Sequence, residues 1–374
     1  MRAIGIIEGL NKAKIMDLEK PQIHESNDVL IEVKFVGISE IDRRFAQGET
    51  FIAPEGFDFL ILGHEVMGRV IEVGPSVVNL QIGDNVVLTS RRNCGKCTEC
   101  ERDNTDLCLS GLYSERGIRG AHGFMAEYIL EKEKYIVKIP EAIEDIAILL
   151  SPLSIAEKIV TSIVSFGHRM DNPKPWPEHA YHDPDWGMEK TAVVVGGNST
   201  AILTALLLRL KSVNTFLLSN RIGTSKIQRL VESAGIKYYE TSVNESCEHF
   251  SQKIGRTDTV IDCSGEAEFN INLLDLLGNS GAFVTSTIPS INLKNNVNIN
   301  RFMLDRLIRN QGMFGCISAN RRYLESAIND LILLKEQFTE PINGIITDKI
   351  PFSNYESAFS ALENTSIKVI LTMD

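Results

Sequence analysis

Four of the seven cysteines lie close together in the 374-residue chain, with the spacing Cys94-x2-Cys97-x2-Cys100-x7-Cys108. Short spacers let one turn present three thiolates to a single ion, and the longer loop returns a fourth that closes a tetrahedron. Zinc accepts four thiolates at about 2.3 Å. An iron–sulfur cluster usually has a tighter fourth spacing followed by Pro, whereas Leu109 follows here, and disulfides do not suit a reducing cytosol. The spacing predicts a closed structural zinc site, which does no chemistry itself.

A glycine turn between a buried strand and an apolar helix is the second motif. Residues 191–195 are predicted as the strand and residues 202–210 as the helix, and the turn between them comprises Gly196, Gly197, Asn198, Ser199, Thr200 and Ala201. In dinucleotide-binding folds this turn faces the pyrophosphate. Asn198 stands where a second glycine is usual, and we expect it to be tolerated because Asn adopts left-handed conformations readily. Ser199 and Thr200 are candidate hydroxyl donors. The alternative is a Rossmann-shaped domain that holds no nucleotide.

The second strand of this region, residues 215–221, bears on cofactor choice. NAD-specific sites end this strand in an acidic residue that binds the ribose hydroxyls. Here the strand ends in Asn220-Arg221, so no acid repels a 2′-phosphate and Arg221 can pair with one. We predict NADP, or both cofactors. A solvated loop arginine is the alternative.

Two kinds of secondary structure must position these residues. Short strands such as residues 29–33, 68–74 and 83–87 predict an irregular all-β, barrel-like domain over the first 140 residues. After residue 190, strands alternate with helices, which indicates a parallel, doubly wound sheet. The polar stretch 168–190 holds four prolines and is predicted to be a long loop. His179 and His182 lie in it, and exposed loop histidines are expected there rather than metal ligands.

Composition excludes several classes of function. Net charge is -11 and the isoelectric point is near 5.3, so a nucleic-acid surface is not expected. No apolar run approaches the ~20 residues of a membrane span, and the N-terminus lacks a signal-peptide pattern. A cytoplasmic location is expected. Cys247, Cys263 and Cys316 are isolated and are predicted to be small buried hydrophobes.

Gly63-His64-Glu65-x2-Gly68, the four-cysteine lobe and the Rossmann-like half together resemble the medium-chain zinc alcohol dehydrogenase superfamily over nearly the whole chain. Within it, the sequence looks most like archaeal-type glucose 1-dehydrogenases, on the stretches Arg91-Arg92-Asn93-Cys94-Gly95, Gly117-Ile118, Gly123-Phe124-Met125, Val137-Lys138-Ile139-Pro140, Pro152-Leu153 and Glu157-Lys158. The resemblance implies an α/β protein with a split GroES-like β-barrel-type catalytic domain (1–150 and 310–374, zinc lobe 91–110). It also implies a Rossmann doubly wound nucleotide-binding domain at 151–309.

The resemblance also implies a catalytic metal site, which this sequence alters. His64 and Glu65 match the family's His-Glu pair. Ser39 replaces a cysteine ligand, Ser151 replaces an acid or amide, and Ile41 replaces a threonine that contacts substrate. A neutral hydroxyl is a poor zinc ligand, so we expect weakened binding unless nearby acids compensate. The candidates are Glu40, Asp42 and Glu157.

For substrate and cofactor, the resemblance assigns Glu115 and Glu157 to the sugar. It assigns Thr285-Ser286-Thr287 and Cys316-Ile317-Ser318 to the nicotinamide half, although the family prefers Asn where Ser318 stands. The function it implies is NAD(P)-dependent oxidation of an aldose such as D-glucose at C1 to the lactone, by a homodimer or homotetramer. The alternative is a degenerate relative with a weakened metal site, acting in binding or assembly or on another substrate.

Overall fold

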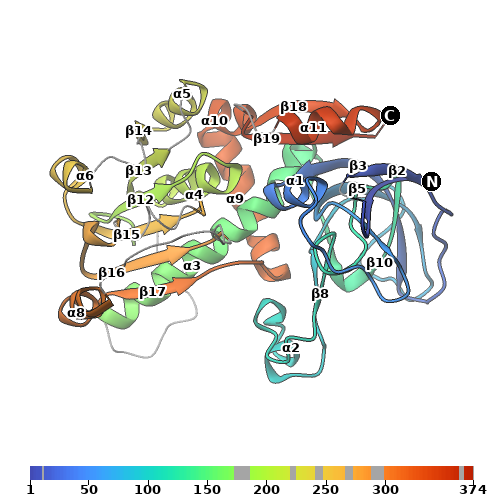
Figure 1. Cartoon of the computed structure of the whole chain (residues 1–374), viewed down its shortest axis with the longest axis horizontal. Coiled ribbons are helices and arrows are strands. Elements are labelled where there is room, and N and C mark those ends of the chain that lie inside the picture. The colour runs from blue at the N-terminus through green and yellow to red at the C-terminus, as the bar shows by residue number, and fades with distance from the viewer. Residues whose placement is uncertain are drawn as a thin grey trace. The chain divides into compact units, whose positions relative to one another are not determined.

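The computed structural model describes residues 1–10, 12–171, 186–219, 225–240, 247–265, 273–287, 299–361 and 366–373, and it divides into two compact units (Figure 1). The first unit comprises Met1–Ser154, Ser318–Ile332 and Ile346–Asp374. The second comprises Ile155–Ile317 and Leu333–Ile345. Both ends of the chain therefore belong to one unit, and the middle forms most of the other. The domain boundaries at residues 150 and 310 remain predictions.

The first unit is built mainly from β-strands. Its largest sheet has the order β11-β6-β5-β3-β19-β18, with β10 also paired to β3, and a smaller sheet has the order β2-β1-β4. The last strand, β19, runs antiparallel to β3 with Val369 opposite Ile38, so the chain ends inside the sheet that its N-terminal part begins. The strands are β1 Arg2–Ile7, β2 Lys14–Asp17, β3 Asp28–Ile38, β4 Phe59–Ile61, β5 Glu65–Val73, β6 Asn85–Leu88, β10 Tyr128–Lys132, β11 Ile136–Lys138, β18 Ile346–Pro351 and β19 Lys368–Thr372.

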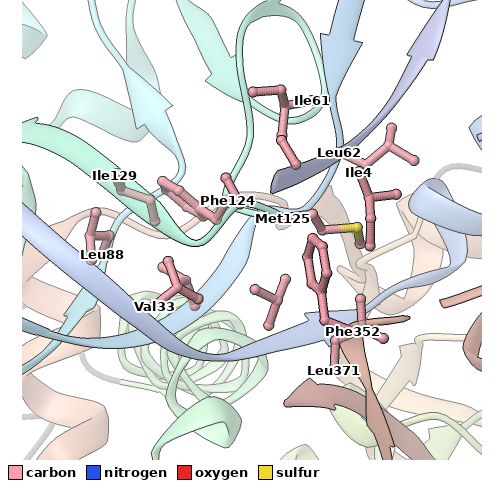
Figure 2. Close-up of a cluster of buried hydrophobic side chains, with 14 of the residues drawn as sticks. Ile4, Val33, Ile61, Leu62, Leu88, Phe124, Met125, Ile129, Phe352 and Leu371 are labelled. Carbon is pink, nitrogen blue, oxygen red and sulfur yellow. The ribbon is translucent and has the colours of Figure 1, made fainter. Parts of the chain in front are cut away.

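Apolar side chains from both ends of the chain share the core of this unit. Figure 2 shows Ile4 and Met125 near Phe352 and Leu371, and all four side chains are almost completely buried. Burying one such side chain contributes roughly 1.5–3 kcal/mol. The C-terminal segment is therefore part of the core of the first unit.

The cysteine-rich segment leaves the main sheets as a separate lobe. A small sheet of order β7-β8-β9 forms its base, and two short helices follow the first cysteines. The elements are β7 Arg91–Arg92, α2 Thr98–Glu101, η1 Thr105–Leu107, β8 Ser114–Arg116 and β9 Gly120–Ala121.

The second unit contains a six-stranded sheet of order β14-β13-β12-β15-β16-β17, and every pairing in it is parallel. The chain runs outward from β12 through β13 to β14 and then returns to β15 on the other side of β12, so the order reverses between β12 and β15. Such switch points bind ligands in doubly wound folds. The predicted parallel, doubly wound sheet is confirmed. The strands are β12 Thr191–Val195, β13 Asn214–Ser219, β14 Lys237–Glu240, β15 Thr257–Asp262, β16 Leu277–Thr285 and β17 Gly312–Gly315.

One continuous helical stretch is longer and more apolar than expected, because no apolar run near the length of a membrane span was expected from the sequence. Residues 141–167, formed by η3 Glu141–Leu149 and the start of α3 Leu150–Asp171, are long and apolar enough to cross a membrane by length and composition. Their most apolar window is 78% buried within the fold, as in the core helix of a globular protein. The other helices are α1 Glu40–Ala46, η2 Glu133–Tyr135, α4 Ser199–Leu210, α5 Ser225–Ser233, α6 Cys247–Ile254, η5 Leu273–Leu276, α8 Ile299–Arg309, α9 Arg321–Gln337, α10 Thr339–Ile345, η6 Phe352–Asn354 and α11 Tyr355–Ala361.

Candidate functional site

The four lobe cysteines converge on one point. Their Sγ atoms all lie within 4.8 Å of one another, with Cys97 to Cys100 at 3.3 Å and Cys94 to Cys100 at 3.8 Å. Four sulfurs placed about 2.3 Å from a tetrahedral zinc are separated by roughly 3.8 Å, so the arrangement fits this ion. Gly95, with φ +69°, makes the tight turn between the first two cysteines.

Local contacts favour the thiolate form of two of these cysteines. The pKa of Cys94 is lowered to about 6, chiefly by a hydrogen bond from the Ser110 side chain, and the same hydroxyl lowers the pKa of Cys108. Burial raises the pKa of Cys100 to about 11, because a thiolate is poorly solvated there. A bound cation would offset that cost, since zinc binds the deprotonated sulfur.

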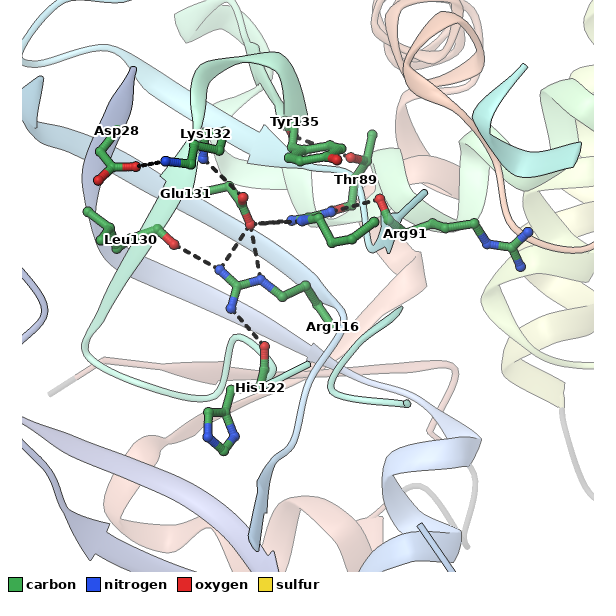
Figure 3. Close-up of polar contacts among 10 residues, drawn as sticks. Asp28, Thr89, Arg91, Arg116, His122, Leu130, Glu131, Lys132 and Tyr135 are labelled. Carbon is green, nitrogen blue, oxygen red and sulfur yellow. Dashed lines mark hydrogen bonds and ion pairs between the residues drawn. The ribbon is translucent and has the colours of Figure 1, made fainter. Parts of the chain in front are cut away.

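Two arginines and a buried glutamate attach the lobe to the large sheet (Figure 3). Arg92 on β7 and Arg116 on β8 both pair with Glu131 on β10. The remaining donors of Arg116 bind the carbonyls of His122 and Leu130 at 2.9 Å. Two cations on one buried carboxylate hold its pKa below the usual range against the opposing effect of burial. This network fixes the base of the lobe.

Glu115, the predicted sugar-binding acid, lies on β8 directly opposite Arg91 on β7. Its side chain is 13% exposed and forms an ion pair with Arg91 at 3.0 Å. Its contact with Ser318 joins two positions that the resemblance assigned separately to the sugar and to the nicotinamide.

Ser39, one of the two altered ligand positions, is the N-cap of α1. Its hydroxyl accepts a hydrogen bond from the Asp42 amide at 3.3 Å and donates one to Asp42 Oδ2 at 2.6 Å. The first of these bonds and the one from the Ser39 amide to Asp42 Oδ2 form a capping box. The same Oδ2 accepts from the Ser39 amide, and Oδ1 accepts from the Gly63 amide at 2.9 Å. Asp42 is completely buried, and both of its oxygens are therefore used by neighbouring donors.

Glu65 is the first residue of β5 and His64 directly precedes it, but the two side chains lie in different surroundings. His64 Nδ1 is buried without a hydrogen-bond partner among the described residues, 3.8 Å from Asp42 Oδ2. Glu65 forms a buried ion pair with Lys368 on β19, whose ammonium also donates to the Ile38 carbonyl at 3.2 Å. Gly37 makes room for this pair, because a Cβ there would collide with Glu65 Oε2.

These contacts do not fit a second metal ion. The Ser39 hydroxyl and the Asp42 carboxylate serve the helix cap, and Glu65 is neutralised by Lys368. In the described part of the chain, the four cysteines form the one group of three or more Cys, His, Asp or Glu side chains arranged to hold an ion. These contacts do not support His64 and Glu65 as ligands of a catalytic metal, and a catalytic role for the two residues stays a prediction.

The other predicted contributors to that metal site are scattered. Glu40 is exposed and pairs with Arg43, and Ile41 packs against the core of the first unit. Ser151 lies in the first turn of α3, where its carbonyl accepts a hydrogen bond from Ser154. Glu157 is completely buried on α3. A cavity of about 500 Å³ in the first unit is lined by none of the predicted site residues.

The cofactor turn is held by Asn198 in a way that differs from the sequence expectation. Asn198 is the N-cap of α4 with φ −92°, so it does not use a left-handed backbone. Its Oδ1 accepts from the Ala201 amide at 2.9 Å, and its Nδ2 donates to the Cys263 carbonyl at 2.7 Å. Gly196, with φ +132°, makes the sharp exit from β12. The asparagine therefore replaces glycine by capping the helix.

The Cys263 carbonyl joins two predicted cofactor segments. It accepts hydrogen bonds from Asn198 Nδ2 and, at 3.0 Å, from Thr287 Oγ1. The Cys316 amide donates to the Thr285 carbonyl at 2.9 Å, and Lys158 on α3 donates to the Ile317 carbonyl at 3.0 Å. Ser286 Oγ is buried without a hydrogen-bond partner among the described residues, which leaves it available to a ligand. Residues 196–201, 285–287 and 316–317 thus lie at the carboxyl ends of β12, β16 and β17, the edge of the sheet at which doubly wound folds bind their ligands.

Some of the predicted residues lie outside the described part of the chain. Others are buried and have no catalytic role. Asn220 and Arg221 are outside it, as are His179 and His182. Cys263 and Cys316 are buried, as expected, and burial raises the pKa of the Cys263 thiol far above its usual value. Sequence reasoning missed Lys368, whose only signal is one charged residue at the start of an otherwise apolar strand.

Two protein families match consecutive parts of the chain. Residues 25–141 match the alcohol dehydrogenase GroES-like domain, and residues 144–373 match the glucose dehydrogenase C-terminus.

Individual relatives match over nearly the full length. The chain is 30% identical over 375 residues to glucose 1-dehydrogenase 2 of Vulcanisaeta moutnovskia, covering 99% of each chain. It is 28% identical to glucose 1-dehydrogenase of Methanocella arvoryzae, again covering 99% of each. A solved structure of Haloferax mediterranei glucose dehydrogenase in complex with NADP, Zn and gluconolactone matches with a TM-score of 0.86 and 27% identity, covering 100% of this chain and 99% of that one.

Proposed function

Because the chain belongs to the glucose dehydrogenase family of the medium-chain zinc alcohol dehydrogenases, we propose that it oxidises an aldose such as D-glucose at C1 to the lactone, with NADP or NAD as the oxidant. The observation that carries the proposal is the full-length match to the Haloferax enzyme, whose structure holds NADP, Zn and gluconolactone. No comparison favours the degenerate, non-catalytic alternative. The residues that differ from the family pattern at positions 39, 151 and 198 instead form hydrogen bonds with residues around them.

In this reaction the sugar C1 loses a hydride to the nicotinamide, and the C1 hydroxyl releases its proton to solvent as the carbonyl of the lactone forms. We assign the cofactor phosphates to the turn 196–201 and the nicotinamide half to residues 285–287 and 316–318. The meeting of the first two segments at the Cys263 carbonyl supports this assignment. Asn220-Arg221 is the proposed site of the 2′-phosphate. Glu115 and Glu157 are the proposed sugar ligands, and His64 is a proposed catalytic residue.

In this proposal, zinc has a structural role. Cys94, Cys97, Cys100 and Cys108 hold one ion, which supplies the cross-link that shapes the lobe. No step of the proposed reaction depends on a second ion at His64 and Glu65.

The test is an aldose panel with NADP and NAD, assayed through the near-ultraviolet absorbance of the reduced nicotinamide. Protein purified without chelator is assayed with and without added zinc. We expect turnover of at least one aldose, with the lactone as product. No turnover of any aldose with either cofactor, in protein that retains its zinc and its fold, would overturn the proposal.

We also propose that the enzyme is a cytoplasmic homo-oligomer, in which two copies meet through β17 and α8. β17 is the edge strand of the six-stranded sheet, and Met313 on it is exposed. The neighbouring helix α8 exposes Leu304, Leu307 and Ile308, with Leu307 76% exposed. An unpaired edge beside an apolar helix face is a hazard in a monomer. Two copies related by a two-fold axis cover both features at once.

Light scattering of the wild type and of Leu307→Lys tests the interface. We expect a dimer or tetramer for the wild type and a smaller species for the variant. Val78→Lys, an exposed apolar position in the first unit, is the matched control and should leave the mass unchanged. A wild-type monomer would contradict the proposal.

A further inference from the structure

Arg91 and Glu115 form a directly opposed pair on two antiparallel strands at the base of the lobe. Arg91 Nε and Nη2 donate to a single carboxylate oxygen, Glu115 Oε1, at 3.1 and 3.0 Å. Side chains opposed in this way across antiparallel strands are in direct contact, and a pair of opposite charge is favourable. Both are largely buried, so the pair is less screened than a surface salt bridge.

Ser318 completes the contact from a distant part of the chain. Its hydroxyl accepts from Arg91 Nη2 at 3.0 Å and donates to the same Glu115 Oε1 at 2.8 Å. The residue has φ +53°, a left-handed conformation that serine adopts at a cost. The backbone there is held in a conformation that directs this hydroxyl onto the Arg91–Glu115 pair.

Arg91 is itself fixed by further contacts. Its Nη1 donates to the Asp106 carbonyl at 2.7 Å, and its guanidinium lies 4.0 Å from the centre of the Tyr113 ring. The adjacent Arg92 points to the opposite side of the short strand, toward Glu131, and Figure 3 shows Arg91 directed away from that network. Successive residues of a strand face opposite sides, so one arginine anchors the lobe and the other serves Glu115.

All hydrogen bonds that the described residues make to the Glu115 side chain go to Oε1, and none goes to Oε2. The carboxylate is thus held by one oxygen while the other keeps its acceptor capacity. Arg91 already balances the negative charge of Glu115, so Oε2 is suited to accept a hydrogen bond from an uncharged hydroxyl. A carboxylate without an ion-pair partner would also attract cations.

We propose that Arg91 and Ser318 are positioning residues that hold Glu115 by Oε1 and present Oε2 to a hydroxyl of the sugar. The inference rests on the proposed function and identifies how this chain fixes its sugar-binding acid with serine at position 318. Restricting a carboxylate to one orientation removes the entropy that sugar binding would otherwise lose. Ser318 therefore acts on sugar affinity through Glu115, without itself touching the sugar.

A double-mutant cycle between Ser318→Ala and Glu115→Gln tests this on full-length protein, with KM for the sugar and kcat measured separately. We expect Ser318→Ala to raise the sugar KM about five- to tenfold, the range that the loss of one hydrogen bond accounts for, and to change kcat and the NADP KM by smaller factors than the sugar KM. In the Glu115→Gln background, Ser318→Ala should have little further effect. Ser318→Gly removes the hydroxyl and relaxes the left-handed backbone, so it should match Ser318→Ala in KM even where stability differs.

Ser357→Ala is the matched control, because among the described residues this hydroxyl on α11 binds a local carbonyl, that of Asn354. Additive effects in the cycle, or an unchanged sugar KM in both Ser318 variants, would overturn the inference. Calorimetric titration of the NADP complex with the sugar separates this result from failure of the proposed function. If the wild type binds an aldose without oxidising it, only the proposed reaction is overturned. The double-mutant cycle is then evaluated from the dissociation constants of the sugar. A wild type that neither binds nor oxidises any aldose overturns both.

Discussion

The carboxylate of Glu65 and the ammonium of Lys368 form an ion pair in the interior of the first unit, with both residues almost fully buried. Three strands bring them together: β5 carries Glu65, β19 carries Lys368, and β3 between them supplies Gly37 and the Ile38 carbonyl. The lysine supplies the positive charge that a buried carboxylate requires.

Removing the lysine should therefore be costly. We expect Lys368→Met to lower the free energy of unfolding by about 3–5 kcal/mol, because it leaves an uncompensated buried charge. Urea denaturation measures the change. The double variant Glu65→Gln/Lys368→Met should recover much of the loss, since it removes both charges. Wild-type stability in the single variant would show that Glu65 is compensated by something other than this lysine.

Metal content should reflect one site. We expect about one zinc per chain by elemental analysis of protein purified without chelator, since four thiolates form a closed site and the donors near His64 are already used. Cys100→Ser should lose most of this zinc and lower the thermal midpoint. Two tightly held zinc ions per chain would contradict this prediction and would point to a second site at His64 and Glu65.

His122 should make the protein sensitive to acid. Its ring lies 4.7 Å from the Phe57 and Phe59 rings, and burial, helped by the charge of Arg116, lowers its pKa to about 4. The unfolded chain binds the proton at about 6.5, so protonation favours unfolding. Stability from this group is complete above about pH 6.5 and declines as the pH falls toward 4. Unfolding midpoints across this range check the slope, which should flatten in His122→Phe. An unchanged slope in that variant would assign the acid sensitivity to other groups.

Asn198 should be needed for both the helix and the cofactor. Asn198→Ala removes the cap and should cost about 1 kcal/mol of stability. Asn198→Asp keeps the capping oxygen but loses the donor to Cys263 and places a negative charge near the phosphate site. We expect it to retain more stability than Asn198→Ala yet to bind NADP more weakly, as measured by fluorescence titration. NADP affinity in Asn198→Asp equal to that of the wild type would place the phosphates away from this turn.

Local patterns in the sequence were sufficient for the zinc lobe and for the parallel sheet. The cysteines lie within one short segment, so their spacing alone limits where the thiolates can go, and the tertiary structure brings all four sulfurs together as predicted. The strand–turn–helix at residues 191–210 likewise depends on neighbouring residues, so its existence could be read from hydrophobic pattern and glycine placement. Its detail could not, because the second hydrogen bond of Asn198 goes to the distant Cys263 carbonyl.

The sequence by itself determined the fold class, the four-cysteine lobe and the strand–turn–helix at residues 191–210, because each follows from residues close together in the chain. Only the tertiary structure decided which side chains serve one another across long separations. It paired Lys368 with Glu65 and Ser318 with Glu115, and it assigned Asp42 to a helix cap. These outcomes depend on the antiparallel pairing of β19 with β3 and of β7 with β8, and strand register across a long loop is set by the packing of the whole unit rather than by local sequence.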